Sequence, residues 1–420
     1  MARKWAGTAI VIYFLILVFM YLYLFNGDTS LPQQWIGTAA DPATFLNARE
    51  LMLSEQYSQI RNFMFFAYNA FDWIVYFFIL LFGLSRVFER VAASQSKWKI
   101  VQAGVYLFLL SLLSYVVTFP LSYISYNLSK SYHISTQTFS SWMKDGLIDF
   151  WVNFGQMVII VSVLYWLINK SPKRWWFHAW LLSIPFFFFM MFIQPVVIDP
   201  LYNDFYPLKN KELETEILKL ASQADIPAEH VYEVNMAEKT NALNAYVTGI
   251  GANSRIVLWD TTLNRLKEKE ILVIMAHEMG HYVEKHIYIG IAGYLILTFA
   301  GLWLTARLMK SIITRYGKVL KITGVGNLSS LPLFLLITAM LLFASSPLSN
   351  FVSRYQEERA DQYAMEMLED KESAITMFQE LTRSGLSQVN PPLLVKWFRY
   401  SHPTMLERII SVENYHTVEE

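Results

Sequence analysis

Seven long apolar stretches dominate the pattern of hydrophobic and polar positions along the chain. Each is about twenty residues long with few charges, which is the length that an α-helix needs to cross the hydrocarbon core of a bilayer. The pattern therefore predicts a polytopic bundle of membrane helices. The first stretch lacks a small-residue cleavage site, so we expect a retained span rather than a signal peptide. The stretches are Trp5–Phe25, Asn62–Gly83, Ile100–Ile124, Phe150–Ile168, Trp176–Val197, Ile287–Leu308 and Leu331–Phe351.

Two polar regions are long enough to form a domain outside the membrane, Asp199–Lys285 and Ser353–Glu420. Two spans separate these regions, so both lie on the same side. In the first region we predict a polar helix at Lys209–Gln223 and then a small sheet. Its strand-like runs are Val231–Val234, Ala245–Thr248 and Ile256–Asp260.

The chain thus divides into four parts. Residues 1–197 hold the first five spans, 198–286 and 352–420 form the extramembrane domain, and 287–351 hold the last two spans. A polar loop between the first two spans carries an amphipathic helix near Ala43–Tyr57. The predicted fold class is mainly α, a seven-span membrane bundle with a small α+β domain.

The composition agrees with a membrane protein, because 54% of the residues are hydrophobic and only 16% are charged. An ordinary soluble domain is less apolar. The net charge is zero, which gives no indication of a nucleic-acid partner. The chain has no cysteine, which excludes disulfides, thiolate metal ligands and a cysteine nucleophile. Any metal must be held by His, Asp or Glu.

One carboxylate, Asp72, falls inside the second predicted span. Carboxylates at such a depth normally face the protein interior or a water-filled cavity. Asp72 therefore either lines such a cavity or pairs with a neighbouring helix and holds the bundle together. The sequence favours neither alternative.

Basic residues are distributed unevenly over the short loops. The N-terminus and the loops after spans two, four and six carry most of them, including Arg86, Arg90 and Lys310. Short cytoplasmic loops are enriched in Lys and Arg. This rule places the N-terminus in the cytoplasm and the extramembrane domain on the opposite side.

The segment Ile271–His286, ILVIMAHEMGHYVEKH, contains two histidines four residues apart in a helix-compatible run. Residues at this spacing share a helix face, so His277 and His281 can bind one zinc ion. Glu278 then lies beside the metal, where it can take a proton from a water molecule. This is the HExxH arrangement of a metallopeptidase. The alternative is a helix whose histidines are only solvated or hydrogen-bonded.

A zinc hydrolase usually has three protein ligands and one position open for water. The run SRYQEERADQYA places Glu357 and Asp361 four residues apart on one helix face. Glu357 can complete a His-His-Glu set, and Asp361 can hydrogen-bond a ligand histidine and fix its tautomer. Taken alone, such a run more often forms a solvated acidic helix with surface ion pairs.

Together with YSHPTMLER near the C-terminus, these motifs resemble the integral-membrane CAAX prenyl protease family of zinc metallopeptidases. The segment QPVVIDPLYNDFYPL is similar to the one that leads into that family's catalytic domain, and the seven-span layout is similar too. HtpX-type membrane proteases share the zinc motifs but are shorter and have fewer spans. The resemblance to them is therefore more distant.

The resemblance implies one zinc ion per chain, with His277, His281 and Glu357 as its ligands. It implies that Glu278 is the general base and proton shuttle and that Asp361 supports a ligand histidine from outside the ligand set.

The SHPTMLER motif implies a place near the substrate carbonyl for His402 and a place near the supporting acid for Arg408. A His or Arg near the metal can stabilise the oxyanion of the tetrahedral intermediate. Without the resemblance, His402 would be interpreted as a surface histidine before a proline.

Asn244, Ala245 and Tyr246 resemble the family's NAY motif, which lies on an edge strand. An extended peptide can add to such an edge through main-chain hydrogen bonds, whatever its side chains are. The preceding MAEKTNAL is less basic and polar than the family pattern, so the resemblance does not extend to side-chain specificity.

We therefore predict a membrane-embedded zinc metalloendopeptidase, whose helices the resemblance implies enclose a chamber. In eukaryotic members of the family, the last three residues are removed from proteins that end in a prenylated cysteine motif. A prokaryotic member would instead cleave membrane-associated or misfolded peptides without prenyl specificity. The expected partners are membrane lipids and a peptide or lipidated protein substrate, in a prokaryotic plasma membrane or a eukaryotic ER membrane. In the family the catalytic domain faces the cytosol, opposite to the side that the basic residues indicate.

The alternatives to a protease are a transporter and a zinc-binding protein without catalysis. A transporter with an incidental HEMGH would suit the seven spans and Asp72, but it leaves the ordered combination of HEMGH, ExxxD and SHP unexplained. It also predicts no bound zinc. A zinc-binding protein without catalysis has no need of Glu278.

Overall fold

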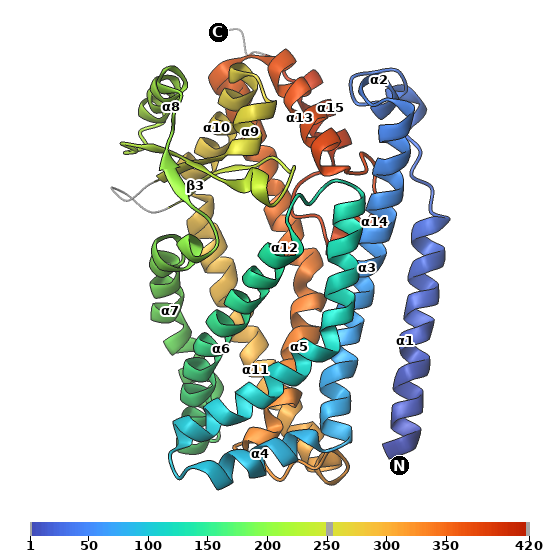
Figure 1. Ribbon diagram of the computed structural model, residues 1–420, viewed down its shortest axis with the longest axis vertical. Coiled ribbons are helices and arrows are strands. Elements are labelled where there is room, and N and C mark those ends of the chain that lie inside the picture. The colour runs from blue at the N-terminus through green and yellow to red at the C-terminus, as the bar shows by residue number, and fades with distance from the viewer. Residues whose placement is uncertain (1, 249–254, 417–420) are drawn as a thin grey trace.

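Long helices build a bundle, and a smaller mixed domain sits at one end of it (Figure 1). The computed structural model describes residues 2–248 and 255–416. Within them, 7 helical stretches are long and apolar enough to cross a membrane, which confirms the predicted number of spans. Their helices are α1 (Ala2–Phe25), α3 (Ala48–Leu81), α5 (Lys99–Ser131), α6 (Phe139–Lys170), α7 (Trp175–Ile193), α11 (His286–Leu320) and α12 (Leu331–Leu368).

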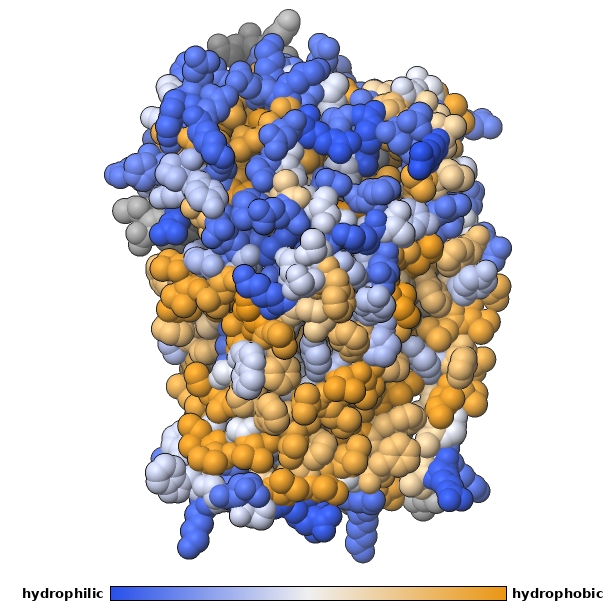
Figure 2. Space-filling model, in the orientation of Figure 1, coloured by the Kyte–Doolittle hydropathy of each residue, from blue (hydrophilic) through white to orange (hydrophobic). Residues whose placement is uncertain are grey.

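The surface of the molecule separates into an apolar band and polar ends. On the face shown in Figure 2, hydrophobic residues cover the bundle, while hydrophilic residues cover the mixed domain and fringe the other end. The N-terminus and α4 (Leu84–Gln95) lie at this other end, opposite the mixed domain (Figure 1). The N-terminus and the mixed domain thus lie at opposite ends of the bundle, as the predicted order of spans requires. Which end faces the cytoplasm stays a prediction.

The helix α3 corrects one expectation about the first loop. The segment near Ala43–Tyr57 is not a separate amphipathic helix, because α3 runs unbroken from Ala48 to Leu81, after a short α2 (Pro42–Phe45). Asn47 accepts hydrogen bonds from the Arg49 and Glu50 amides, and the Glu50 carboxylate accepts one from the Asn47 amide. This capping box starts the helix at Ala48, and no Gly or Pro follows to stop it before the membrane.

The helix α12 is longer than the last predicted span. It contains 38 residues and carries both the apolar stretch, which we expected to end at Phe351, and the ExxxD run, which we assigned to the extramembrane domain. Pro347 lies inside it but does not end it. Glu357 and Asp361 are therefore held by the extramembrane end of a membrane-spanning helix.

The mixed domain contains a four-stranded sheet in the order β1-β2-β4-β3. The strands β2 and β4 are parallel, and β1 and β3 pair antiparallel to them at the two edges. Three strands lie where the sequence predicts them, and β1 was missed because it is three residues long and ends in Pro207. Proline is tolerated at such an edge. The strands are β1 (Phe205–Pro207), β2 (Val231–Val234), β3 (Ala245–Thr248) and β4 (Arg255–Trp259).

The helix α10 (Glu268–Val283) forms the centre of the mixed domain. Its apolar face buries Ile271, Met275 and Met279 in a core that it shares with the sheet and with the surrounding helices. Burial of each such side chain contributes about 1.5–3 kcal/mol. The remaining helices of the domain are α8 (Lys211–Gln223), α9 (Asp260–Arg265), α13 (Lys371–Gly385), α14 (Leu393–Phe398) and α15 (Met405–Glu413).

Short helical turns connect several of these elements. They are η1 (Gln33–Trp35), η2 (Gln194–Ile198), η3 (Asp199–Leu201), η4 (Met236–Glu238) and η6 (Leu328–Ser330). A polar contact fixes the mixed domain to the bundle: Lys239 Nζ lies 2.7 Å from Asp145 Oδ2 of α6 and donates to the Tyr202 carbonyl. The domain therefore sits on the bundle in a defined position.

Candidate active site

The two sequence motifs meet where α10 packs against α12. Gly280 lies at the contact, and a Cβ atom at this position would be 3.1 Å from Ala360 Cα and 3.1 Å from Tyr363 Cβ. Such distances are shorter than ordinary van der Waals contact. The glycine inside HEMGH thus lets the two helices approach closely enough for residues on both to share one site.

The closest approach brings together the three predicted metal ligands. The Nε2 atoms of His277 and His281 are 3.2 Å apart, and Glu357 oxygens lie 3.2 Å from the first and 3.5 Å from the second. Within the described residues, these side chains form the one group of His, Asp and Glu side chains that could hold a metal ion, with ligand atoms within 4.8 Å of one another.

These residues fit a zinc ion. A tetrahedral zinc ion with bonds of about 2.0–2.2 Å places its ligand atoms about 3.3–3.6 Å apart, close to the separations between His277, His281 and Glu357. Glu357 Oε2 is buried and has no hydrogen-bond partner among the described residues. A buried carboxylate oxygen without a donor is unfavourable unless a cation satisfies it. Geometry and donor chemistry both match the His-His-Glu set of a zinc hydrolase.

The charge state of His281 also suits a metal ligand. Burial, followed by the neighbouring His277 imidazole, lowers the pKa of His281 to about 4, so that the ring is neutral at physiological pH. At His277, burial lowers the pKa, but the Asp361 and Glu357 carboxylates raise it more strongly, to about 10. Carboxylates that attract a proton to an imidazole also attract a metal cation to it.

Asp361 supports His277 from the side away from the other ligands. Its Oδ1 atom is 2.7 Å from His277 Nδ1, which leaves His277 Nε2 facing Glu357. Arg408 of α15 is buried and donates to the same carboxylate through Nε at 2.7 Å and Nη2 at 2.5 Å. Two donors of Arg408 are thus committed to Asp361. This arrangement favours a positioning role for Arg408 over direct contact with substrate.

His286 supports His281 as Asp361 supports His277, by a hydrogen bond to its Nδ1 atom. The sequence did not predict this role. Lys285 adopts a left-handed conformation, with φ 56°, between α10 and α11. This turn brings His286 Nδ1 to within 2.8 Å of His281 Nδ1. Because His281 Nε2 faces Glu357, the contact fixes the tautomer that a metal ligand needs. The only signal in the sequence was a third histidine five residues after His281, which is not a helical spacing.

Glu278 lies between the metal-ligand group and the sheet. Burial raises the pKa of its carboxyl group to about 7, and a hydrogen bond from the Val247 backbone partly opposes this rise. A general base works best when its pKa is near the working pH. Glu278 is therefore both placed and tuned to exchange a proton at neutral pH.

His402 approaches the ligand group from the C-terminal segment. Its Nε2 atom is 3.4 Å from Glu357 Oε1, while 56% of its side chain is exposed. Arg354 of α12 fixes the preceding turn by donating to the Lys396 and Tyr400 carbonyls, both at 2.9 Å. His402 is thus held at the edge of the site, with part of its ring accessible to a ligand.

The strand β3 brings the predicted NAY residues to the site. It pairs with β4 on one side and forms the edge of the sheet on the other. Asn244 accepts from the Trp259 amide, so that by alternation the main-chain groups of Ala245 point away from β4. Asn244 and Ala245 also line a cavity beside Glu278, whereas Tyr246 does not line it.

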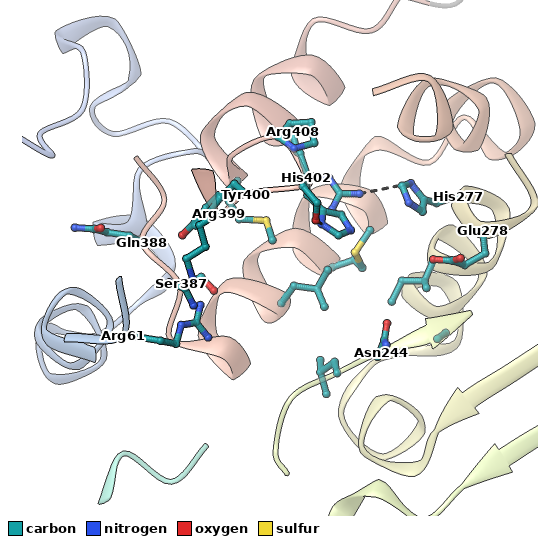
Figure 3. A pocket seen from close by; sticks show the side chains of 18 residues that line it. Arg61, Asn244, His277, Glu278, Ser387, Gln388, Arg399, Tyr400, His402 and Arg408 are labelled. Atoms are coloured by element: carbon teal, nitrogen blue, oxygen red, sulfur yellow. Dashed lines mark hydrogen bonds between the residues drawn. The ribbon is translucent and has the colours of Figure 1, made fainter. Parts of the chain in front are cut away.

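This cavity has a volume of about 390 Å³. Figure 3 shows His277, Glu278 and Asn244 at one side and Arg61, Arg399 and Ser387 at the other, with His402 between them. The volume is in the range of small-ligand pockets. The intramembrane carboxylate Asp72 does not line this cavity, and within the described residues its side chain has no ion-pair or hydrogen-bond partner. The ion-pair alternative for Asp72 therefore has no support from the structure.

Comparisons with known proteins show the family to which the chain belongs. The family model described as Peptidase family M48 matches residues 207–416, and one described as CAAX prenyl protease N-terminal, five membrane helices, matches 37–204. An uncharacterized metalloprotease, YhfN of Bacillus subtilis, is 52% identical over 98% of this chain and 97% of its own length. The CAAX prenyl protease 1 of Saccharomyces cerevisiae is 28% identical over 75% of this chain and 72% of its own.

The architecture also resembles a solved structure. The crystal structure of Ste24p from S. mikatae matches with a TM-score of 0.80 and covers 97% of this chain and 97% of that chain. The sequence identity is 24%. This likeness shows that the seven-span bundle with its mixed domain is a shared fold.

The close packing at Gly280 can be tested with one methyl group. We expect Gly280→Ala to destabilise the protein by about 1–3 kcal/mol and to weaken metal binding, because α12 must move away from α10. Thermal unfolding in detergent and zinc titration would measure the two effects. Gly290→Ala is the control, since nothing lies within 4 Å of a Cβ atom at that position. Equal behaviour of the two variants would contradict the proposed contact.

The role of His286 predicts a loss of metal affinity without loss of a ligand. We expect His286→Phe to weaken zinc binding about 10–100-fold, measured by competition with a chelator, because His281 loses the partner that fixes its tautomer. His230→Phe changes an exposed histidine and should leave the affinity unchanged. If both variants bind zinc like the wild type, His286 does not support the ligand.

Proposed function

The chain belongs to peptidase family M48 and is a multi-pass membrane metalloprotease, and from this premise we propose that it is a zinc endopeptidase acting through His277, His281, Glu357 and Glu278. The observation that carries the proposal is the spacing of the three ligand atoms, which matches tetrahedral zinc. Glu278 stands next to this group, on the side of the cavity. A transporter or a non-catalytic zinc protein would need neither this base nor the adjoining edge strand.

The mechanism assigns a separate task to each side chain. A zinc ion held by this group would supply a Lewis acid and a water of lowered pKa. Glu278 accepts the proton of the attacking water and then delivers it to the leaving amine, which restores the carboxylate. Its pKa of about 7 suits transfer in both directions.

His402 and Arg408 differ in what they can do for the transition state. His402 is accessible and borders the site, so it can donate a hydrogen bond to the oxyanion that forms on the scissile carbonyl. Arg408 is buried and bound to Asp361, so we assign it the task of holding Asp361 against His277. His402 would thus contact the reacting carbonyl directly, whereas Arg408 would act on it only through Asp361 and His277.

The edge of β3 positions the substrate. An extended peptide can pair with the outward main-chain groups of Ala245, and this pairing would lay its backbone past Glu278. Such binding uses main-chain atoms and accepts varied side chains. We infer that the substrate enters the site as an extended, unfolded segment.

The proposed substrates are membrane-associated proteins, including proteins that end in a prenylated CAAX motif. This class is supported by the span of the family matches and by relatives that carry the name CAAX prenyl protease 1. A quality-control protease without prenyl specificity is the alternative. Paired assays with a farnesylated CAAX peptide and an unprenylated extended peptide distinguish the two, because only the first substrate class requires the lipid.

Two substitutions separate metal binding from proton transfer. We expect Glu278→Gln to retain one zinc ion but to lose activity by about 10²–10⁴-fold, because the amide cannot accept the proton. Glu357→Ala should lose both zinc and activity. Zinc content by atomic emission and peptide cleavage in detergent would show this. Glu358→Ala, at an exposed neighbouring position, is the control. Full activity of Glu278→Gln would exclude Glu278 as the base.

Removal of the metal gives an independent test. Dialysis against a chelator should abolish cleavage, and stoichiometric zinc should restore it, because the three ligands are all side chains of the folded protein. Cleavage that persists in protein shown to be free of metal would contradict a metallopeptidase mechanism.

A further inference from the structure

Two arginines converge in the cavity, on the side opposite the base. Arg61 comes from α3 and Arg399 from the turn after α14, and both line the same cavity as Glu278 (Figure 3). In the figure their side chains extend toward one another, at the side of the cavity opposite His277 and Glu278. The cavity thus has a catalytic side and a cationic side.

Within residues 2–248 and 255–416, no carboxylate forms an ion pair with either arginine. The Arg399 guanidinium donates to the Asn62 side-chain oxygen and stands over the Phe65 ring. The Arg61 guanidinium lies 5.4 Å from the centre of the Tyr57 ring, and its Nε atom is buried with no acceptor among these residues. Both charges are therefore held by neutral groups only.

The proximity of the two cations is itself unfavourable. Burial lowers the pKa of Arg399 to about 10, and the positive charge of Arg61 adds to this effect. Like charges in a partly desolvated site repel each other unless an anion lies between them. An anion with two oxygens suits such a pair, because a guanidinium binds a carboxylate through two parallel hydrogen bonds.

The protein holds the two arginines in place from several directions. Ser58 of α3 donates to the Leu386 carbonyl at 2.9 Å, and Ser54 donates to the Ser387 carbonyl at 2.8 Å. These bonds fix the loop after α13 beside Arg61. Arg354 fixes the turn that carries Arg399. The cationic side is thus a built part of the cavity rather than a pair of mobile surface side chains.

We propose that Arg61 and Arg399 bind the C-terminal carboxylate of the peptide substrate, so that the enzyme cuts at a fixed short distance from a free C-terminus. The inference rests on the proposed peptidase function. A peptide has one main-chain carboxylate, at its C-terminus, and the cavity holds the catalytic base at one side and the cations at the other. A volume of about 390 Å³ admits only a few residues between them.

The distance between the arginines and Glu278 would then set the length of the released fragment. The edge strand β3 binds the backbone without regard to side chains, so position along the chain must be set by another contact. Capture of the terminal carboxylate supplies it. An enzyme of this kind releases fragments of constant length from substrates of different sequence.

The experiment compares peptides that differ only at the C-terminus, with full-length zinc-loaded enzyme in detergent. The set contains one sequence as free acid, as amide, as an amide with a terminal Asp, and as free acid lengthened by one residue. We expect KM for the free acid to be about 10–100-fold lower than for the amide, because hydrogen bonds to a charged group are lost. We expect the lengthened peptide to be cut one bond further toward its C-terminus, as mass spectrometry would show.

The arginine variants assign the effect to this site. Arg61→Met and Arg399→Met should raise KM for the free acid to that of the amide. Arg61→Lys, which keeps the charge, should restore part of the preference. Arg49→Met is the matched control, since Arg49 lies on the same helix α3 and is exposed. Unchanged zinc content and melting temperature would show that each variant is folded.

Binding to Glu278→Gln protein separates this inference from the proposed function. If the free acid binds more tightly than the amide and Arg61→Met removes the difference, the carboxylate site stands even when no peptide is cleaved. Equal binding and equal cleavage of acid and amide would overturn the inference while leaving the peptidase intact. Equal affinity for the amide with a terminal Asp would show that the arginines bind an acidic side chain, and this result also overturns it.

Discussion

The contact between α10 and α12 is the interaction on which the site depends. Neither helix carries a complete set of metal ligands, because two lie on the first and one on the second. Gly280 removes the side chain that would hold the two helices apart. Asp361, on the same face of α12 as Glu357, then reaches His277 and is itself held by the buried Arg408. One close helix contact thus produces the ligand set and its first layer of support.

The membrane bundle contributes directly to this arrangement. The helix that supplies Glu357 and Asp361 is continuous with a membrane span, and another long helix, α3, supplies the arginine at the far side of the cavity. Because α12 and α3 are continuous, packing of their spans in the bundle also fixes where their site residues lie. A domain cut away from the membrane would lose the span that holds Glu357 in place and, with α3, Arg61. This dependence explains why the chemistry of a small peptidase domain is built into a polytopic protein.

Local patterns in the sequence were enough to predict the spans, three strands and the metal-ligand candidates. The HEMGH and ExxxD runs are short, helical and chemically specific, so their residues could be selected without knowledge of the fold. Helix ends were harder: α3 and α12 extend beyond their apolar stretches, because polar helix formers continue the helix outside the membrane and no breaker stops it. The position of His286 depends on the left-handed conformation of Lys285, which no pattern in the sequence predicts. Arg61 and Arg399 meet across more than three hundred positions of sequence, so only the fold reveals that they share a cavity.

The most direct test of the proposed centre is X-ray absorption at the zinc edge, measured on the full-length purified protein. Two imidazole nitrogens and one carboxylate oxygen from the protein, with one further light atom and no sulfur, are the predicted ligands, at about 2.0–2.2 Å. A spectrum with a different number of imidazoles, or one that is unchanged in Glu357→Ala protein, would contradict the assignment of His277, His281 and Glu357 as the zinc site.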